Sequence, residues 1–439
     1  MLDVAIVGGG VAGLATAHYL LALRPELRLS VVAGSARVGG NVRTLRRDGC
    51  VVDVGPDALV AQADAPSACD DLGVAAESPS SAAARVHVAH DGRLDLLPEG
   101  LVFGVPRSFA AIATTRLLSL PAKLRAACDL VLPGRQGDGS LSVVESRLGR
   151  EAKENLVEPL VAGIYGGELE RLDAAIVMPQ LAATRGSLIR ALSRAPRRFP
   201  KMVGPARGME ALVDALARSI SQERVLRAAR VIRIERSRAG ERLHLADGAT
   251  LEAAHVVVAA PPKAALPLLG PHVDGLEHAL RARMRSAVVV VLAYDASTSE
   301  LPDGSGILVA RREALAFVGV TFVHAKWPTR VREGRAIVRA VVDLDRRPDL
   351  ASAADAEIVQ AVHVDLSRHA RVAAPVWSHV EHYPEATPIP ELGHRARMDE
   401  ARSLARRAGF SLVGAAYDGA GLAGCLRGAR ELAQTLAAG

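Results

Sequence analysis

The amino-acid sequence predicts an α/β protein in which a parallel-sheet unit is interleaved with a second, mixed sheet and a helical segment. Three observations predict this class. A strand, a glycine turn, a helix and a second strand open the chain, strand and helix patterns return after Gly208, and the last 30 residues supply one more strand and helix. The 439 residues suffice for two or three domains. A composition of 49% hydrophobic and 23% charged residues excludes disordered, collagen-like and coiled-coil chains.

The first 60 residues have the pattern of a βαβ unit. Residues 4–7 form a short apolar strand, and a glycine-rich turn follows. Residues 14–23 carry apolar side chains at helical spacing, and Pro25 ends this helix. Residues 29–32 supply the second strand, and a further strand is expected at residues 51–54.

The segment from Gly92 to Arg198 is expected to consist of helices broken by proline and glycine. Within it, residues 117–132 have an amphipathic pattern that is interrupted at Pro121. One interpretation is an ordinary half-buried helix. The other is a basic amphipathic surface that contacts anionic lipid.

After Gly208 the pattern returns to alternating strands and helices. Helices are expected over residues 209–220 and 422–436, and a hairpin is expected at Asp247-Gly248. Strands are expected at residues 231–234, 255–260, 287–294, 306–310, 336–342 and 410–414. The three runs between residues 287 and 342 indicate a substantial second sheet. The nucleotide-type unit therefore opens the chain, reappears in its middle and is completed at its end.

Several classes of protein are disfavoured by simple counts. No run of about 18 apolar residues lacks charge or proline, and the N-terminus lacks the basic segment of a secretory signal. The four cysteines form no CxxC pair, so we expect a cytoplasmic protein with no disulfide framework and no metal site. The net charge of +6 comes from scattered arginines, and only 3% of residues are aromatic, so nucleic-acid binding is not expected. Peripheral contact with the inner face of a membrane stays open.

The glycine motif Gly8-x-Gly10-x-x-Gly13 lies between a strand and a helix, as the Rossmann-like dinucleotide fingerprint requires. Gly8 permits a tight turn, Gly10 lets the backbone approach a pyrophosphate, and Gly13 allows the helix to pack closely on the strand. The helix N-terminus then faces the phosphates with free N–H groups. The motif predicts dinucleotide binding.

The ribose carboxylate that usually accompanies this fingerprint is missing. Its expected position, about 20 residues past the last glycine, is Ala33, and no Asp or Glu occurs from Leu29 through Arg47. Downstream, Arg37-Val38-Gly39-Gly40 and Gly55-Pro56-Asp57 can bring backbone and one positive charge close to a cofactor. Taken with the first glycine motif, these runs favour a flavin over a nicotinamide.

These three N-terminal motifs resemble those of flavin amine-oxidase-like proteins. Two further segments make the chain similar to the protoporphyrinogen/coproporphyrinogen oxidase family: Leu156-Val157-Glu158-Pro159-Leu160-Val161-Ala162-Gly163-Ile164-Tyr165-Gly166-Gly167 and Gly414-Ala415-Ala416-Tyr417-Asp418-Gly419-Ala420-Gly421-Leu422-Ala423-Gly424-Cys425. Supporting runs are Pro179-Gln180-Leu181, Gly186-Ser187-Leu188, Gly208-Met209, Trp327-Pro328-Thr329-Arg330 and Pro388 with Gly393-His394. The resemblance spans nearly the whole chain in the same order.

The resemblance implies FAD as cofactor and a set of residues around it. The pyrophosphate would lie on Gly8, Gly9, Gly10, Val11, Ala12 and Gly13, and the central part of the cofactor on Arg37, Gly39, Gly40 and Asn41. Gly55, Pro56, Asp57 and Ala58 would lie near the isoalloxazine, Val231 near the adenine, and Ala420, Gly421 and Leu422 near the pyrimidine end. A porphyrinogen would pack on the turn of Gly163, Tyr165 and Gly166.

The resemblance also implies a division of the chain into five segments. The FAD-binding domain would comprise residues 1–91, 199–265 and 406–439. A mixed-sheet substrate domain would comprise residues 266–405, and a helical subdomain, either membrane-facing or capping the substrate, residues 92–198. The implied reaction, in haem biosynthesis, oxidises protoporphyrinogen IX or coproporphyrinogen III to the porphyrin by three two-electron hydride transfers, with oxygen as acceptor.

Some positions depart from the family pattern or leave alternatives open. Ala33 replaces the ribose acid, and Leu101-Val102-Phe103-Gly104 lacks an arginine found in some members, which is more similar to the coproporphyrinogen-type branch. Pro390 replaces an aromatic residue. Asp57, as a catalytic candidate, could orient the substrate or cap its turn. Arg85, Arg107 and Arg116 are candidates for binding propionates, whereas His394 and Cys425 are interpreted as structural. The rival functions are a flavin oxidase of another polycyclic or amine substrate, and a flavin-free tetrapyrrole-binding homologue.

Overall fold

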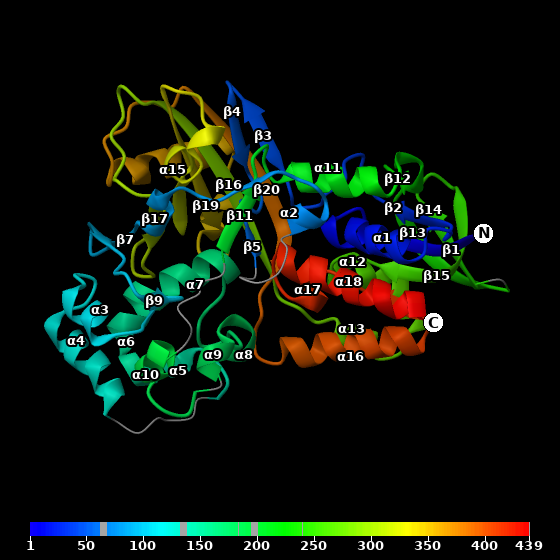
Figure 1. The fold of residues 1–439 in the computed structure, drawn as a ribbon, viewed down its shortest axis with the longest axis horizontal. Helices are drawn as coiled ribbons and strands as arrows, with labels where there is room; N and C mark the ends of the chain where they lie inside the picture. The colour runs from blue at the N-terminus through cyan, green and yellow to red at the C-terminus, as the bar shows by residue number, and fades with distance from the viewer. Residues whose placement is uncertain (62–67, 132–137, 183, 195–200, 239, 439) are drawn as a thin grey trace.

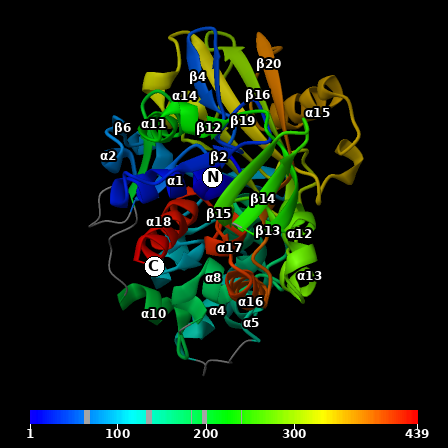
Figure 2. The ribbon, with the colours of Figure 1, turned by 90° about the vertical axis from the view of Figure 1, so that its right-hand side faces the viewer.

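A computed structural model describes residues 1–438 except 62–67, 132–137, 183, 195–200 and 239. Two large sheets and a helical region make up the molecule (Figure 1). Both chain termini lie at the same end, beside the first sheet (Figures 1 and 2).

The first sheet has the strand order β12-β2-β1-β15-β14-β13, with β21 also paired to β15. Its strands are β1 (Leu2–Val7), β2 (Leu29–Val32), β12 (Val225–Leu226), β13 (Val231–Ser237), β14 (Gly240–Leu245), β15 (Thr250–Val258) and β21 (Phe410–Leu412). β1 runs parallel to both β2 and β15, and β13, β14 and β15 are antiparallel. The predicted strands in this part of the chain and the predicted hairpin are confirmed.

Helices cover both faces of this sheet (Figures 1 and 2). One face carries α1 (Val11–Leu23), α11 (Glu210–Ser219) and α18 (Leu422–Ala438). The other carries α12 (Pro262–Leu269), α13 (Leu276–Ala279) and α16 (His394–Arg407), with α17 (Ala415–Asp418) at its edge. Alternate residues of β1 enter the two cores, since Ile6 packs with α1 and Ala5 with the opposite layer.

The second sheet has the order β20-β16-β19-β18-β17-β7-β8. Its strands are β7 (Val86–His90), β8 (Arg93–Leu96), β16 (Met284–Asp295), β17 (Gly306–Val309), β18 (Gly319–Phe322), β19 (Arg335–Asp343) and β20 (Trp377–Pro388). α15 (Asp355–Ser367) covers one face, and α14 (Val323–Lys326) packs near β19. The mixed sheet is confirmed, and its twelve-residue strand β20 was not predicted.

β7 joins this second sheet by pairing parallel to β17, although residues up to 91 were expected in the first FAD-binding segment. Its alternating Val86, Val88 and His90 read equally well as a strand of either sheet, because such a pattern does not specify the partner. The domain limits themselves stay a prediction.

The helical region contains α3 (Phe109–Thr114), α4 (Leu120–Ala127), α5 (Ser142–Leu148), α6 (Arg150–Ala152), a π-helical turn (Lys153–Val157), α7 (Glu158–Tyr165), α8 (Ala174–Val177), α9 (Pro179–Ala182) and α10 (Leu188–Arg194). The expectation that Pro121 interrupts a helix was wrong. Pro121 lies in the first turn of α4, whose N-cap Ser119 accepts a hydrogen bond from the Ala122 N–H. Proline fits there because a first-turn N–H has no intrahelical acceptor.

Short strands complete the fold. They are β3 (Thr44–Arg47) with β4 (Cys50–Asp53), β5 (Leu59–Ala61) and β6 (Ala76–Glu77) on either side of β11 (Lys201–Pro205), and β9 (Leu101–Val102) with β10 (Val105–Pro106). α2 (Ala68–Asp71) precedes β6. Within the described ranges, no helix combines the length and the apolar character needed to cross a bilayer.

Candidate functional site

The turn between β1 and α1 is shaped by its glycines. Gly8 has a φ of +124°, which favours glycine. A Cβ on Gly13 would overlap the Gly8 carbonyl oxygen, whereas a Cβ on Gly10 would meet no described atom within 4 Å. The turn is therefore packed tightly on its protein side and open at Gly10. The first-turn N–H groups of α1, including Val11 and Ala12, have no intrahelical acceptor and can bind an anion.

A second glycine loop lies directly against this turn. The Gly39 N–H donates to the Gly9 carbonyl at 2.8 Å, and Gly40 has a φ of +60°. Arg37 donates to the carbonyl oxygens of Gly40 at 2.5 Å and Val42 at 2.8 Å. The guanidinium of Arg37 thus ties the loop together. Its predicted contact with a phosphate stays a prediction.

The loop at Gly55 approaches the Asn41 backbone, since a Cβ on Gly55 would overlap the Asn41 carbonyl oxygen. Arg339 donates to the Gly55 carbonyl at 2.6 Å, and Asn41 donates from Nδ2 to the Ala386 carbonyl at 2.9 Å. The Tyr383 hydroxyl lies 3.3 Å from the same Cβ position and is buried without a hydrogen-bond partner. Burial raises the pKa of Tyr383 to about 12, so its proton is available to donate.

Asp57 forms an ion pair with a residue from a distant part of the chain. Its carboxylate lies 2.6 Å from Lys326 Nζ at the end of α14, and the neighbouring Pro56 and Ala58 are half-buried. Burial disfavours the charged form, but Lys326 and Arg339 outweigh it and lower the Asp57 pKa to about 2. Of the two roles considered for Asp57, the recorded hydrogen bond of its carboxylate goes to Lys326 and not to its own turn, and a role in orienting the substrate stays a prediction. A carboxylate with this pKa stays ionised at neutral pH and is a weak base.

A buried network lies next to this pair. Arg330 donates to Asp53 at 2.8 Å and to Glu77 at 2.6 Å, and Arg330 and Asp53 are each about 1% exposed as side chains. Asp53 also accepts from the Thr44 hydroxyl at 2.6 Å and the Met209 N–H at 2.7 Å. Burial raises the pKa of Asp53 to about 6 against these stabilising contacts. We call this set of five residues the Asp53 network.

The C-terminal glycine turn ends where α18 begins, at Leu422. Gly421 has a φ of +92°, and a Cβ there would meet no described atom within 4 Å, as at Gly10. Ala420 is half-buried. The first N–H groups of this seventeen-residue helix have no intrahelical acceptor, and the space in front of them is open. Because α18 packs along α1, this space lies beside the first glycine turn.

Asp418 fixes the shape of this turn. Its carboxylate accepts from the Gly414 N–H at 2.7 Å and from Arg402 at 2.5 Å. A Cβ on Gly428 would overlap the Asp418 side chain, so glycine at that position of α18 lets the carboxylate sit against the helix.

Ala33 lies at the end of β2 and is 1% exposed. Its methyl group is 2.5 Å from the position that a Cβ on Gly9 would take, so it faces the glycine turn. The Ala33 N–H donates to the Leu226 carbonyl at 2.8 Å, which places β12 and the start of β13, at Val231, alongside. The position expected for a ribose acid therefore points at the turn but carries no charge.

The turn after α7 packs against the side chain of Arg285. Gly166 has a φ of +71°, and a Cβ there would lie 2.7 Å from Arg285 Cδ. Arg285 Nη1 donates to the Gly163 carbonyl at 3.3 Å, and its Nε lies 2.9 Å from the buried Asp343 carboxylate. Tyr165 ends the helix, and burial raises its pKa. The three predicted substrate residues thus lie together on one turn, and this turn packs on the Arg285–Asp343 ion pair.

The other candidates fall in different places. Arg85 pairs with Asp303 at 2.5 Å, Arg107 donates to the Leu192 carbonyl at 3.0 Å, and Arg116 lines a surface cavity. His394 is buried and bonds the Ala416 carbonyl at 2.8 Å, and Cys425 is 8% exposed within α18, so the structural interpretation of both residues agrees with the structure.

Sequence reasoning missed the side chains of the second-sheet part of the chain that contact the candidate site residues. Lys326, Arg339, Tyr383 and Arg285 come from the second sheet or its connections. Only Lys326 had a local signal, because it directly precedes the Trp327–Arg330 run. No group of three or more potential metal ligands occurs among the residues that the structure places.

A sequence model of flavin-containing amine oxidoreductases matches residues 11–437. The chain is 29% identical to the coproporphyrinogen III oxidase of Bacillus subtilis (strain 168), covering 96% of this chain and 95% of that protein. It is 26% identical to the chloroplastic protoporphyrinogen oxidase of Nicotiana tabacum, covering 98% and 85%. A crystal structure from Exiguobacterium sp. 255-15 superposes with a TM-score of 0.88 at 26% identity, covering 99% and 98% of the two chains.

Proposed function

The chain belongs to the family of flavin-containing amine oxidoreductases and is an FAD-dependent oxidoreductase; on that premise we propose that it oxidises a porphyrinogen, coproporphyrinogen III in preference to protoporphyrinogen IX. The carrying observation is the near-full-length similarity to relatives named coproporphyrinogen III oxidase, together with glycine turns that leave free space at Gly10 and Gly421.

The residues present fit FAD at three points. The two glycine turns leave free space at Gly10 and Gly421, each in front of a helix N-terminus. Between the cofactor-side loops and the second sheet, the Tyr383 hydroxyl and Arg339 Nε are buried without hydrogen-bond partners. Orphaned donors of this kind are rare in folded proteins, so they support a polar ligand beside Gly55.

Each part of the candidate flavin site has a role in the proposed reaction. When bound, FAD supplies a two-electron acceptor that oxygen reoxidises with release of hydrogen peroxide. The N-terminus of α18 would stabilise negative charge at the pyrimidine end. Converting a porphyrinogen to a porphyrin removes six electrons and six protons, so three rounds consume three oxygen molecules. The pyrrole protons would pass to solvent, because ionised Asp57 is too weak a base.

On the substrate side, the turn at Gly163–Gly166 would present backbone and the Tyr165 ring to a flat tetrapyrrole. Arg285 and Asp343 would keep this turn in place, since each is 5% exposed or less and they pair with one another. Such a turn orients a substrate and excludes water without supplying a reacting group.

The test is a flavin-release spectrum followed by oxygen-consumption assays with both porphyrinogens. We expect one FAD per chain, oxygen uptake with coproporphyrinogen III, and a lower kcat/KM with protoporphyrinogen IX. Faster turnover of protoporphyrinogen IX would reverse the substrate preference. No turnover of either, with an amine or another polycyclic compound oxidised instead, would contradict the proposal. A protein that binds no FAD would favour a non-catalytic tetrapyrrole carrier.

We also propose that the protein works in the cytoplasm with peripheral contact at the inner face of the membrane. Three apolar side chains on α3 and α4 support this contact, namely Phe109, Leu120 and Leu124, which are 56%, 72% and 64% exposed. The test is cosedimentation with phosphatidylglycerol and phosphatidylcholine vesicles. A Leu120→Ser/Leu124→Ser variant should lose binding, and equal recovery of both proteins with vesicles would contradict the contact.

A further inference from the structure

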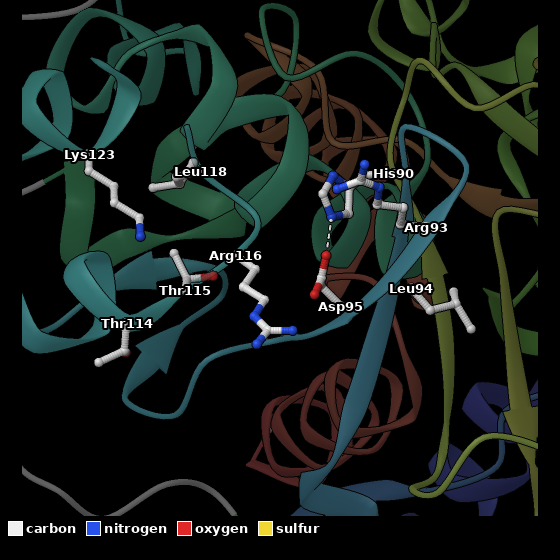
Figure 3. Close-up of a pocket in the computed structure, with 9 residues that line it drawn as sticks. All are labelled: His90, Arg93, Leu94, Asp95, Thr114, Thr115, Arg116, Leu118 and Lys123. Carbon is white, nitrogen blue, oxygen red and sulfur yellow. Dashed lines mark hydrogen bonds and ion pairs between the residues drawn. The ribbon is translucent and has the colours of Figure 1, made fainter. Parts of the chain in front are cut away.

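A surface cavity of about 490 Å³ lies between the β7–β8 hairpin and the segment that joins α3 to α4. It is separate from the glycine turns described above, and His90 and Asp95 form one wall while Thr115 and Lys123 lie on the other (Figure 3). Arg116 extends into the space between these two groups (Figure 3). Basic side chains from separate structural elements therefore line the cavity.

Two arginines in this lining lack an acidic partner. Arg93 and Arg116 form no ion pair with any residue whose placement is described. Some other arginines of the helical region are paired, as Arg147 is with buried Asp129 at 2.8 Å and Arg150 with Glu154 at 2.6 Å. Arginines left unpaired and facing a common cavity can bind an external oxyanion.

The one acid recorded in the lining is already engaged. Asp95 accepts a hydrogen bond from His90 Nε2 at 2.9 Å, and His90 is 7% exposed. Lys123 donates to the Ala113 carbonyl at 2.8 Å, which holds its ammonium at the edge of the cavity. Three cations against one carboxylate leave a net charge of about +2 when His90 is neutral.

We propose that this cavity binds a phosphate group. The guanidinium forks of Arg93 and Arg116 match the bidentate geometry of a phosphate, and Lys123 adds a point charge. A phosphate carries up to two negative charges, which the net charge of the lining balances, whereas a single carboxylate would leave an uncompensated cation. This proposal does not rest on the porphyrinogen proposal, because the cavity lining includes neither the glycine turns nor the turn at Gly163–Gly166.

The phosphate can come from two sources. It can belong to a free phosphate or phosphomonoester, or to the headgroup of an anionic lipid, since exposed Leu120 and Leu124 lie on α4 beside Lys123. The two sources place the same oxyanion on the same arginines. Both a free phosphate and an anionic lipid must therefore be tested.

The experiment uses FAD-loaded protein, so that the dinucleotide site does not compete for phosphate. Inorganic phosphate is titrated by calorimetry at constant ionic strength in chloride, with succinate as the carboxylate probe, and binding to phosphatidylglycerol vesicles is measured in parallel. The His90 imidazole resonances, assigned with a His90→Gln variant, report whether phosphate enters this cavity. We expect them to move with phosphate and not with chloride.

Variants decide between this site and general basic charge. Arg93→Gln and Arg116→Gln should each weaken phosphate binding at least tenfold, and the double variant should abolish it. Arg407→Gln is the matched control, because it removes the same charge from an exposed arginine at the end of α16. Oxygen consumption by Arg93→Gln and Arg407→Gln should match the parent, which separates a failure here from a failure of the proposed activity.

Two results support the proposal and assign its source. Saturable phosphate binding that the double variant lacks indicates a free phosphate, and vesicle binding alone, again lost in the double variant, indicates a lipid headgroup. The proposal is overturned if neither probe binds, if succinate binds and phosphate does not, or if Arg407→Gln weakens binding as much as Arg116→Gln.

Discussion

We call the first-sheet side and the second-sheet side of the candidate flavin site its two walls, and they are built by different means. The wall on the first sheet is made of backbone, with glycines at residues 8–13, 39–40 and 421 that bring chain segments together or leave space. The wall on the second sheet is made of side chains, with the Asp53 network and the Asp57–Lys326 pair joining it to the first. Backbone sites depend on residues that lack a side chain, and ion-paired sites depend on two side chains being present together.

This difference determines how each wall should respond to substitution. An ion pair buried at about 1% exposure leaves an unpaired charge when one partner is removed. A glycine facing open space disturbs no protein atom when it gains a methyl group, so any effect there must pass through a ligand.

Arg330→Gln should have the largest effect, because it leaves the Asp53 carboxylate buried without its cation. We expect a loss of about 3–5 kcal/mol in the free energy of unfolding, measured by urea denaturation at pH 7. Arg371→Gln is the control, since Arg371 and its partner Glu300 are both more than 70% exposed, and it should change the free energy by less than about 1 kcal/mol. Equal losses would show that burial of the Asp53 network is unimportant.

Gly10→Ala should lower FAD affinity by about 10- to 100-fold, equivalent to about 1.4–2.8 kcal/mol, while the thermal stability of the apoprotein stays unchanged. The added methyl enters space that no described atom occupies. Gly13→Ala should lower both quantities, because its methyl group overlaps the Gly8 carbonyl. Titration with FAD and thermal unfolding of the apoproteins separate the two outcomes. A destabilised Gly10→Ala apoprotein would mean that the turn is closed.

Ala33→Glu should strengthen FAD binding by about 1–2 kcal/mol if its carboxylate reaches a ribose hydroxyl past the Gly9 turn. Ala33→Gln, with the same shape and no charge, should gain less. The measurement is the dissociation constant from quenching of flavin fluorescence. An unchanged constant for Ala33→Glu would show that the ribose lies elsewhere.

Two further substitutions test the dependence of stability on pH. The folded-state pKa of Asp57 is lowered to about 2 from 3.8, so its stabilising contribution is complete above about pH 4 and is lost as the pH falls towards 2. The stability difference between the parent protein and Asp57→Asn should therefore be constant from pH 5 to 8. Equilibrium unfolding across this range measures it.

For Asp53 we expect the opposite dependence of stability on pH, which provides an internal comparison. Its folded-state pKa is raised to about 6, so its contribution is complete below about pH 3.8 and is lost as the pH rises through 6. Relative to Asp53→Asn, the parent protein should become less stable between pH 4 and 7. A flat difference for Asp53, or a sloping one for Asp57, would contradict these assignments.

The same contrast explains what could be predicted from the sequence. The glycine turn and the strand at residues 29–32 were predicted because each depends on neighbours a few residues away. The pairs Asp57–Lys326 and Asp53–Arg330 join residues 269 and 277 positions apart, and no local pattern specifies such a partner. β20 was missed because its charged and proline residues hide the alternation of a strand.

The packing of α18 against α1 joins two segments that are synthesised at widely different times. The first strands and the Gly10 turn leave the ribosome hundreds of residues before the helix that faces them. Until residues 410–438 emerge, β15 lacks β21 beside it and α1 lacks its packing partner. Firm binding of the flavin is therefore expected only once α18 has been synthesised and packs against α1.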